Sequence, residues 1–320
     1  NASETVITYS FSGISGNAGE YVSGYSLPNP TSDGIFSFSE AHMAATRLAL
    51  GEFEKIANLK FVEIEETQDE VGALRFAFTD AENLLDSGAQ AAGWASAPYS
   101  NAVAGDVWIN SSNMAANENW DQGTSTNFST LLHEIGHTLG LNHPFDEPHV
   151  IPTGFDLSNY TLMSYTDPDG VWWYPYWADS GSYTLSSTPM VYDIAALQYL
   201  YGAADYNETD TVYTYDTTTP FAKTIWDSGG NDTLDFTNFS TDLKISLKIR
   251  QTFSYFWKNM PGTLAKSTMF LTQAPTVRRS VAKWPDIDQP RSEALELTRI
   301  AARCAKGAYK ASLPTVVVMI

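Results

Sequence analysis

The sequence is poor in cysteine, and this limits how the fold is stabilised. Its 320 residues include 1 cysteine, Cys304, so no disulfide bond forms within the chain. Small extracellular domains often depend on disulfides, and here a hydrophobic core or bound metal ions must replace them. Hydrophobic residues make up 43% of the sequence, which suffices for the packed cores of two domains of ordinary size.

Basic residues and long apolar runs are also scarce. The chain has 18 Lys and Arg against 37 Asp and Glu, a formal net charge of −19. Such an excess of carboxylates opposes binding to nucleic acid or anionic lipid and favours divalent cations. No run of about eighteen apolar residues occurs, and the first residues lack a signal-peptide pattern. We therefore expect a soluble chain without a leader that binds neither nucleic acid nor membranes.

The charge changes sign close to residue 250. Residues 1–250 contain 8 Lys and Arg against 33 Asp and Glu, whereas residues 251–320 contain 10 against 4. Glycine becomes rare at the same point. A shift of this size predicts a boundary between two kinds of sequence.

Hydrophobic periodicity predicts a mixed sheet backed by helices, an α+β fold. Strands are expected at Val6–Phe11, Ala73–Phe78 and Val107–Asn110, and helices at Ser39–Ile56, Thr126–Leu141 and Ser187–Leu200. The segment 205–239 is rich in Thr, Asp, Asn and Gly and is typical of strands and tight turns.

The segment HEIGHTLGLNHP at residues 133–144 carries the clearest chemistry. His133 and His137 are four residues apart on one predicted helix, so their side chains share a face and can share a metal ion. Gly140 allows positive φ, which lets the chain leave the helix and bring His143 back as a third ligand. The spacing suits tetrahedral zinc with a fourth position open to water.

Glu134 follows the first histidine and can act as a base. Zinc with three protein ligands lowers the pKa of its bound water to roughly 7, and Glu134 can accept that proton. The short pattern HExxH also arises by chance on surface helices, but the added glycine and third histidine argue against chance. His42 and His149 do not fit the spacing, and we expect them to be structural and loop residues.

A methionine and a tyrosine follow the histidines at an informative distance. Met163 lies some twenty residues after His143, where a turn with methionine packs beneath the zinc in metzincin proteases. Tyr165 could reach the metal or donate a hydrogen bond to the oxyanion formed during attack on a peptide. The alternatives are that Met163 is ordinary core packing and Tyr165 an ordinary half-buried tyrosine.

Residues 5–240 resemble the serralysin family of metzincin zinc proteases. The resemblance rests on HEIGHTLGLNHP, on MSY at 163–165 and on DIAALQYLYGA at 193–203. Pro144 distinguishes this family from astacins, adamalysins and matrix metalloproteases. WINSS at 108–112 resembles the family's edge strand, which would bind an extended substrate as an additional strand.

The resemblance implies a secreted zinc metalloendopeptidase whose protease domain, with a mixed twisted sheet and long helices, occupies residues 1–202. It assigns His133, His137 and His143 as ligands of one catalytic zinc and Glu134 as the base. It also implies that Tyr165 lies close to the metal and moves during turnover. We expect a monomer whose partners are polypeptide substrates and a proteinaceous inhibitor.

WDSGGNDTLDF at 226–236 resembles the first part of the family's calcium-binding β-roll. The resemblance implies structural calcium and a truncated β-roll over residues 203–248. The GGND sequence alone is also compatible with an ordinary hairpin turn. The implied calcium-binding residues are Asn207, Thr209, Thr211, Asp227, Gly229, Gly230 and Asp232.

Residues 249–320 form a basic tail without a counterpart in the family. No nonapeptide repeat follows, and the stretch Ser292–Ala311 has helical spacing. Our hypothesis is that this tail arises from a shifted reading frame or a truncated gene. The alternative is a genuine appendage of one or two helices. Either origin bears on secretion, because the family is exported through a C-terminal signal after the β-roll.

Two other functions stay open from the sequence. The first is a catalytically inactive module that keeps the fold and binds calcium or protein, although the intact Glu134 argues against it. The second is zinc chemistry on a small substrate, as in an aminopeptidase or amidase.

Overall fold

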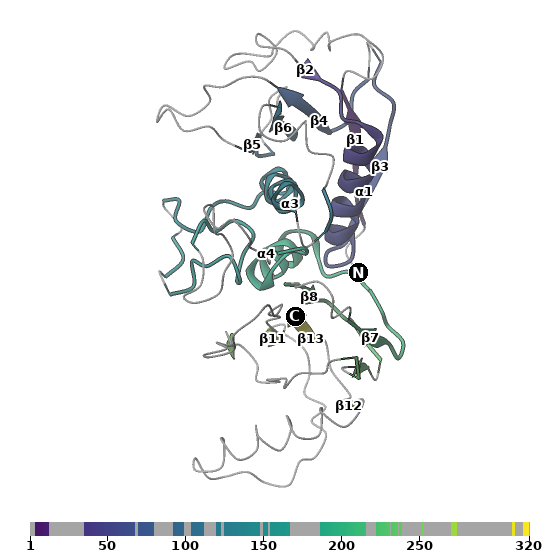
Figure 1. Cartoon of the computed structure of the whole chain (residues 1–320), viewed down its shortest axis with the longest axis vertical. Coiled ribbons are helices and arrows are strands. Elements are labelled where there is room, and N and C mark those ends of the chain that lie inside the picture. Colours follow the sequence, from purple (N-terminus) through teal and green to yellow (C-terminus); the bar gives the residue numbers. More distant parts are fainter. Residues whose placement is uncertain are drawn as a thin grey trace, which may run out of the picture.

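The chain has an α+β fold in which one mixed sheet is packed against helices (Figure 1). This computed structural model confirms the fold class expected from the periodicity. The described residues are 4–12, 35–67, 70–79, 92–98, 104–111, 120–122, 125–147, 150–152, 154–166, 186–215, 222–230, 232–235, 237–238, 251–252, 270–273, 309–310 and 316–319.

The main sheet has six strands in the order β3-β1-β4-β6-β5, with β2 paired to β4. Strands β3, β1, β4 and β6 are mutually parallel, whereas β5 and β2 are antiparallel to their neighbours. The strands are β1 (Thr5–Phe11), β2 (Ile35–Phe36), β3 (Leu59–Glu63), β4 (Leu74–Thr79), β5 (Gly93–Ala95) and β6 (Asp106–Asn110). The three predicted strands are confirmed with small shifts in their bounds.

The edge of this sheet differs from the expectation. The interpretation of residues 108–112 as the edge strand is wrong, because β6 pairs with β4 on one side and with β5 on the other. The antiparallel strand β5 is the edge, with Trp94 opposite Trp108. A buried interior strand offers no free backbone groups. Any substrate that adds to this side of the sheet must therefore pair with β5.

In the described part of the chain, three helices pack below and beside the sheet (Figure 1). They are α1 (Glu40–Glu54), α3 (Thr126–Thr138) and α4 (Val191–Tyr201), and each overlaps a predicted helix. Ser39 caps α1 by accepting from the His42 N–H, and Ser125 caps α3 by accepting from the Asn127 N–H. Such caps satisfy N–H groups that lack a partner in the first helical turn. Of the helices described, none combines the length and apolarity needed to cross a bilayer.

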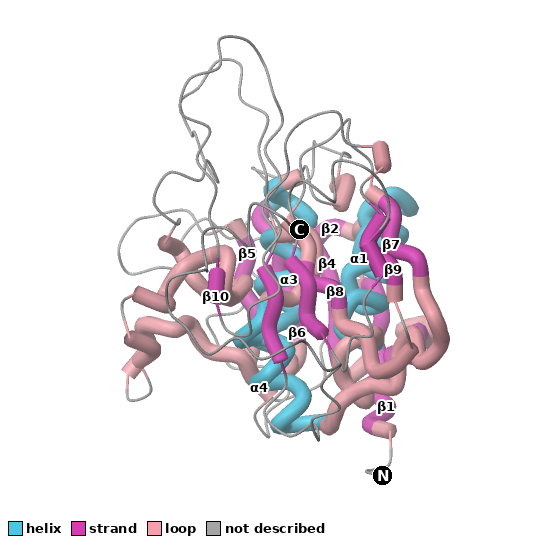
Figure 2. Tube along the Cα trace, turned by 90° about the horizontal axis from the view of Figure 1, so that it is seen from below, coloured by secondary structure: helices cyan, strands magenta, loops and turns pink. Residues whose placement is uncertain are grey.

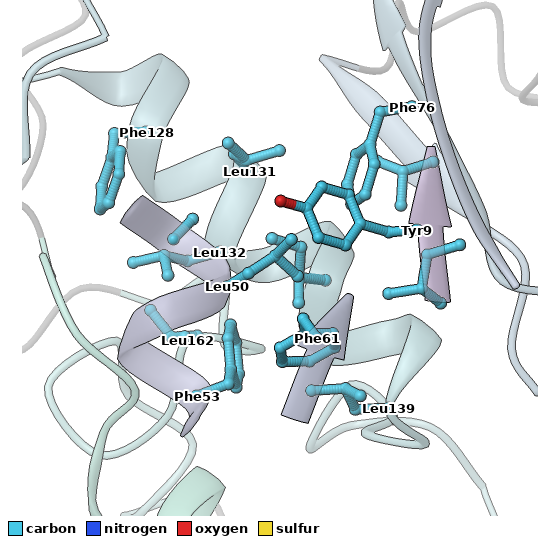
Figure 3. Packing of buried hydrophobic residues seen from close by; sticks show 14 of the residues in the cluster. Tyr9, Leu50, Phe53, Phe61, Phe76, Phe128, Leu131, Leu132, Leu139 and Leu162 are labelled. Atoms are coloured by element: carbon cyan, nitrogen blue, oxygen red, sulfur yellow. The ribbon is translucent and has the colours of Figure 1, made fainter. Parts of the chain in front are cut away.

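The core lies between α1, α3 and the sheet, as Figure 3 shows for some of its residues. Phe53 of α1, Phe76 of β4 and Leu131 of α3 are fully buried. Burying one such side chain stabilises the fold by about 1.5–3 kcal/mol. Helix α3 contributes its apolar face to this core, so its position against the sheet is fixed by packing.

A second group of strands follows the last helix. Strands β7 and β9 pair in parallel, beside each other in Figure 2. The predicted strands and turns in 205–239 are thus confirmed where described. Of the residues 292–311, where a helix was expected, only Tyr309 and Lys310 are described, and they form strand β12. The bounds are β7 (Val212–Thr214), β8 (Thr224–Ile225), β9 (Thr233–Asp235), β10 (Gln251–Thr252), β11 (Phe270–Gln273), β12 (Tyr309–Lys310) and β13 (Val316–Met319).

Candidate metal centre

Helix α3 and the turn after it carry three histidines to one point. His133 and His137 lie one turn apart on α3, which ends at Thr138. Gly140 then adopts φ +97°, in the left-handed region that favours glycine. The N–H of Leu141 donates to the Gly136 carbonyl at 3.0 Å, which closes the helix. The chain reverses there and returns His143 toward the helix.

The ligand atoms of His133, His137 and His143 all lie within 4.8 Å of one another. The Nε2 atoms of His137 and His143 are 3.1 Å apart. Two imidazole nitrogens at this separation face the same small volume. The structure thus brings together the three histidines that the spacing predicted, in an arrangement that can hold a metal ion.

Each imidazole is oriented by a hydrogen bond from its other nitrogen. When Nδ1 donates a proton to an acceptor, the Nε2 lone pair is left free for a metal. All three rings have such an acceptor close to Nδ1. The acceptors are the Leu162 carbonyl for His133 and the Leu141 carbonyl for His137, both at 2.8 Å, and the Asp146 carboxylate for His143, at 3.0 Å.

Burial also favours the neutral form of the two histidines on α3. Burial, together with the neighbouring His137, lowers the pKa of His133 to about 3. Burial likewise lowers the pKa of His137. A metal ligand must be unprotonated, so these shifts prepare the rings for a cation.

Glu134 is buried beside the histidines. Its side chain is 5% exposed, and Oε2 has no hydrogen-bond partner among the described residues. Burial raises the pKa of Glu134 to about 8. Strand β5 lies directly over it: a Cβ added at Gly93 would be 3.2 Å from the Glu134 Cγ. The carboxylate is therefore confined between α3 and the edge strand.

Met163 lies beneath the metal centre, in contact with α3. It is 1% exposed, and a Cβ added at Gly136 would be 2.9 Å from its sulfur. The glycine between the two helical histidines thus lets the Met163 turn approach α3 closely. This contact places the turn so that the Leu162 carbonyl reaches His133.

Asp193 of α4 fixes the same turn from below. Its buried carboxylate accepts hydrogen bonds from the Leu162 N–H at 2.8 Å and the Thr161 hydroxyl at 2.6 Å. It also accepts from the Met190 N–H at 2.8 Å, which caps α4. A continuous set of hydrogen bonds therefore joins the start of α4 to His133.

Two aromatic rings cover the third histidine. The Tyr165 hydroxyl lies 2.9 Å from His143 Nε2, so it reaches the point that the histidines share. Tyr165 is also stacked on His133, with ring centroids 5.6 Å apart. The ring of Phe145 is parallel to that of His143, with centroids 4.9 Å apart and 6° between the planes. Both aromatic rings are exposed at the surface.

The residues expected to bind calcium lie in two adjoining loops. The Ser228 N–H donates to the Tyr206 carbonyl at 2.9 Å, and the Thr233 N–H donates to the Thr211 carbonyl at 2.8 Å. Gly229 and Gly230 permit this approach, because a Cβ at Gly230 would be 2.7 Å from the Thr209 carbonyl. The loops are thus stacked as successive turns of one parallel coil.

Carboxylates point into the space between these loops. Asp232 is 1% exposed, and its Oδ2 has no partner among the described residues. Its Oδ1 accepts from the Thr211 N–H. The Asp227 carboxylate accepts a hydrogen bond from the Tyr213 hydroxyl. The same hydroxyl accepts a hydrogen bond from the Asn207 side-chain amide. Burial raises the pKa of both aspartates, and a bound cation would oppose that effect.

Three contributors to the site were missed by the sequence reasoning. They are Asp146, Asp193 and the edge strand β5. Asp146 lies three residues after His143, a spacing at which a carboxylate can turn back to the ring. Asp193 stands at the third position of α4, the usual place of a capping acid. Both signals were present in the sequence.

The two remaining histidines lie elsewhere. His42 is buried in α1, where its Nδ1 accepts from the Ser39 N–H and its ring packs against Phe38 and Trp120. Its structural role is therefore as expected. His149 lies outside the described residues.

Family models match two parts of the chain. Residues 23–172 match the peptidase M10 model described as Matrixin, and residues 192–256 match the model of the peptidase M10 serralysin C terminal. The first match contains the three histidines and Met163. The second begins in α4 and continues through the stacked loops.

Curated proteins that are similar to this chain include serralysins and a metallopeptidase. Serralysin of Proteus mirabilis is 31% identical over 270 residues, which cover 76% of this chain and 52% of the relative. Serralysin C of Dickeya chrysanthemi is 32% identical over 244 residues, 67% of this chain and 47% of the relative. Metallopeptidase AprA of Pseudomonas marginalis is 32% identical over 237 residues, which cover 67% of this chain and 48% of the relative. The chain spans about half the length of these relatives. With both models and these relatives in agreement, the chain belongs to the serralysin family of M10 metallopeptidases.

Proposed function

We propose that the protein is a zinc-dependent endopeptidase. The observation that carries the proposal is the convergence of the three histidine rings, each with an acceptor at Nδ1. Three imidazoles with a free fourth position are the donor set of catalytic zinc sites. His133, His137 and His143 would hold the ion. Once bound, zinc supplies Lewis acidity and lowers the pKa of a water to roughly 7.

Glu134 is the proposed general base and acid. Its unpartnered Oε2 lies in a dry environment, and burial raises its proton affinity. A bound zinc ion would favour the ionised form of Glu134, and a carboxylate with raised proton affinity can then accept a proton from the attacking water. The same carboxylic acid can then protonate the leaving amine. Peptide hydrolysis needs both transfers.

Tyr165 is the proposed oxyanion donor. Its hydroxyl reaches the shared point of the histidines while its ring is largely exposed. An exposed ring has room to move when a substrate enters, and a phenol can donate to a developing negative charge. The stacking on His133 limits the directions in which the ring can turn.

Strand β5 is the proposed substrate platform. It is the antiparallel edge strand and lies directly over Glu134. An extended polypeptide can add to such an edge through backbone hydrogen bonds, which brings internal peptide bonds to the base. This favours long substrates over the small ones of an aminopeptidase or amidase. The buried Glu134 also argues against an inactive binding module.

We also propose that the stacked loops bind structural calcium and that the protein acts outside the cell. The two buried aspartates and the backbone carbonyls of the loops are hard oxygen ligands of the kind that calcium requires. Calcium would stabilise a chain that has no internal disulfide. Extracellular action agrees with the acidic composition and with the relatives' class of enzyme.

A casein digest tests the proposed activity. The purified protein, the same protein after chelation and Glu134→Ala are compared at equal concentration. We expect proteolysis by the parent, loss on chelation with recovery on adding zinc, and a loss of at least about 100-fold for Glu134→Ala. Undiminished proteolysis by Glu134→Ala would show that another group is the base. No proteolysis by the parent would favour the inactive module.

A further inference from the structure

The backbone on both sides of Tyr165 is tied to one carboxylate. Residues 164–166 belong to no helix or strand. The Ser164 hydroxyl donates to Asp156 Oδ1 at 2.6 Å and accepts from the Thr166 N–H at 3.1 Å. A serine hydroxyl has one proton to donate and lone pairs to accept with, and both capacities are used here. Ser164 therefore joins Asp156 to the residue that follows Tyr165.

Further hydrogen bonds hold the same three residues. The Ser158 N–H donates to the Thr166 carbonyl at 2.8 Å, so both backbone polar groups of Thr166 are bound. The Ser164 N–H donates to the Thr161 carbonyl at 3.4 Å. Tyr165 thus lies between two residues whose backbone is held by hydrogen bonds. The freedom left to its phenol is mainly rotation about the side-chain bonds.

The Asp156 end of this arrangement is anchored as well. Asp156 precedes a tight turn in which the Tyr160 N–H donates to the Leu157 carbonyl at 2.8 Å. The N–H of Tyr192 in α4 donates to the Tyr160 carbonyl at 2.9 Å, which joins the turn to the helix. Ser164 is 7% exposed, so its short bond to the carboxylate is shielded from water. The carboxylate is therefore a fixed support for the chain at Tyr165.

The phenol of Tyr165 depends on this support because packing covers little of it. Tyr165 is 69% exposed, and its described ring contacts are with the two histidines His133 and His143 and with Phe145. Its hydroxyl is nevertheless 2.9 Å from His143 Nε2. The hydroxyl lies at the far end of the side chain, so a small rotation of the backbone displaces it more than it displaces the Cα. A displacement of about 1 Å can cost a catalytic group roughly 100-fold in rate.

We propose that Asp156 and Ser164 are positioning residues for Tyr165. They fix the backbone from which the phenol swings, so that its hydroxyl returns to the point shared by the histidines. The proposal rests on the endopeptidase function and on Tyr165 as the oxyanion donor. Neither Asp156 nor Ser164 has a described hydrogen bond to a histidine of the metal centre, so both act through Tyr165.

Variants of the two residues test the proposal by kinetics. In Ser164→Ala and Asp156→Ala we expect kcat and kcat/KM to fall together by about tenfold, with KM almost unchanged. Asp156→Asn keeps an oxygen that accepts from the serine hydroxyl and should restore most of kcat. The Kd for zinc should stay the same in all three variants. Equal losses of kcat in Asp156→Asn and Asp156→Ala would overturn the hydrogen bond as the means of positioning.

Ser10→Ala is the matched control. The Ser10 hydroxyl also joins a carboxylate to a backbone N–H, because it donates to Glu66 Oε1 at 2.8 Å and accepts from the Gly72 N–H at 2.9 Å. Ser10 is buried on β1, so its variant loses the same kind of contact. We expect kcat to remain at the parental value. A loss as large as that in Ser164→Ala would show that the effect is general and would overturn the proposal.

A double-mutant cycle decides whether Ser164 acts through Tyr165. Ser164→Ala should lower kcat in the parent and cause no further loss in Tyr165→Phe, because the hydroxyl to be positioned is then absent. The same loss in both backgrounds would contradict the proposal. Full kcat in Tyr165→Phe would contradict it too, since the phenol would then have no role in the reaction.

NMR of ring-labelled tyrosine gives a measurement that needs no turnover. The signal of Tyr165 is the one that disappears in Tyr165→Phe, and stacking on His133 places it in the ring current of the imidazole. We expect Ser164→Ala to move this signal toward that of an unstacked tyrosine, and Asp156→Asn and Ser10→Ala to leave it in place. An unmoved signal in Ser164→Ala would overturn the positioning. If the parent cleaves no peptide, the endopeptidase function fails, and the NMR signal alone decides the positioning.

Discussion

Among the three proposed metal ligands, His143 has the most exposed support. Its Nδ1 is held by the Asp146 carboxylate, which is 47% exposed, whereas the other two rings donate to backbone carbonyls. Loss of an acceptor behind a ligating imidazole typically weakens metal binding 10- to 100-fold, roughly. We expect Asp146→Ala to raise the Kd for zinc by about tenfold or more. Competition with a chromophoric chelator measures this.

A conservative variant separates orientation from charge. Asp146→Asn retains an oxygen that can accept from Nδ1, so it should restore most of the affinity. Equal loss in Asp146→Ala and Asp146→Asn would mean that the negative charge matters and not the hydrogen bond. Unchanged affinity in both variants would contradict the assigned role.

Asp193 provides a pH-dependent prediction. Burial raises its pKa from 3.8 to about 6 in the folded protein, despite the hydrogen bonds it accepts. Because the folded state holds the proton more tightly, stability falls as pH rises from about 4 to about 6, by about 3 kcal/mol at most. Below a pH of about 4, the protonated Asp193 makes its full contribution to stability. Asp193→Asn removes this titration.

Urea unfolding of the parent and Asp193→Asn at several pH values between about 3.5 and 7 checks the sign. The free energy of unfolding of the parent should decrease relative to that of the variant as pH rises through this window. The variant is expected to be less stable at every pH, because an amide leaves one of the donors unpaired. A pH-independent difference would contradict the assignment.

The three proposed ligands could be predicted from sequence, whereas the support that Asp193 gives to the turn beside His133 could not. His133, His137 and His143 are linked by spacing along one helix and one turn, which is local information. Asp193 reaches the site through Leu162, thirty-one positions earlier in the chain. Such a contact depends on how α4 packs beneath the turn, so local spacing does not reveal it.

At the level of elements, length decided what was predictable. Helices α1 and α3 run for 15 and 13 residues, long enough for apolar periodicity to identify them. Strand β5 has 3 residues and carries no measurable period. Its pairing with β6 depends on tertiary packing and not on local sequence. That is why the edge of the sheet was assigned to the wrong strand.

The close contact of β5 with α3 gives a prediction for Gly93. A Cβ added there would be 3.0 Å from the Ile109 side chain, 3.1 Å from the Trp108 carbonyl and 3.2 Å from the Glu134 Cγ. Gly93→Ala must therefore move either the strand or the proposed base, Glu134, by a few tenths of an ångström. We expect kcat to fall by roughly tenfold, since the base acts at hydrogen-bond distance.

Gly51→Ala is the matched control, because a Cβ at that position of α1 meets nothing within 4 Å. It should stabilise the helix by about 0.5–1 kcal/mol and leave kcat unchanged. A loss of kcat in Gly51→Ala equal to that in Gly93→Ala would show that the effect is not specific to β5.

On the scale of the whole molecule, the stacked loops should couple calcium to stability. Binding to the folded state alone stabilises by about 2.7 kcal/mol at a calcium concentration 100 times Kd. We expect added calcium to raise the Tm, and Asp232→Asn to remove most of that rise. Calorimetry with calcium and with magnesium measures it. An equal response of Asp232→Asn and the parent would place the calcium elsewhere.

Toward the C-terminal end, the family match stops close to the change in composition. The match to the serralysin C-terminal model ends at residue 256, close to the sign change near residue 250. The domain bounds 1–202, 203–248 and 249–320 stay predictions, as does the shifted reading frame. Composition predicts a boundary because charge and glycine content are properties of a whole segment. It could not identify a fold beyond it.

X-ray absorption at the zinc edge tests the central claim most directly, because it counts the nitrogen ligands of the bound ion. For the purified protein we expect one zinc with three imidazole nitrogens at about 2.0–2.1 Å and one further oxygen. His143→Ala should retain only two of these nitrogens. A zinc bound by fewer than three imidazoles, or enclosed by four protein ligands, would contradict the account.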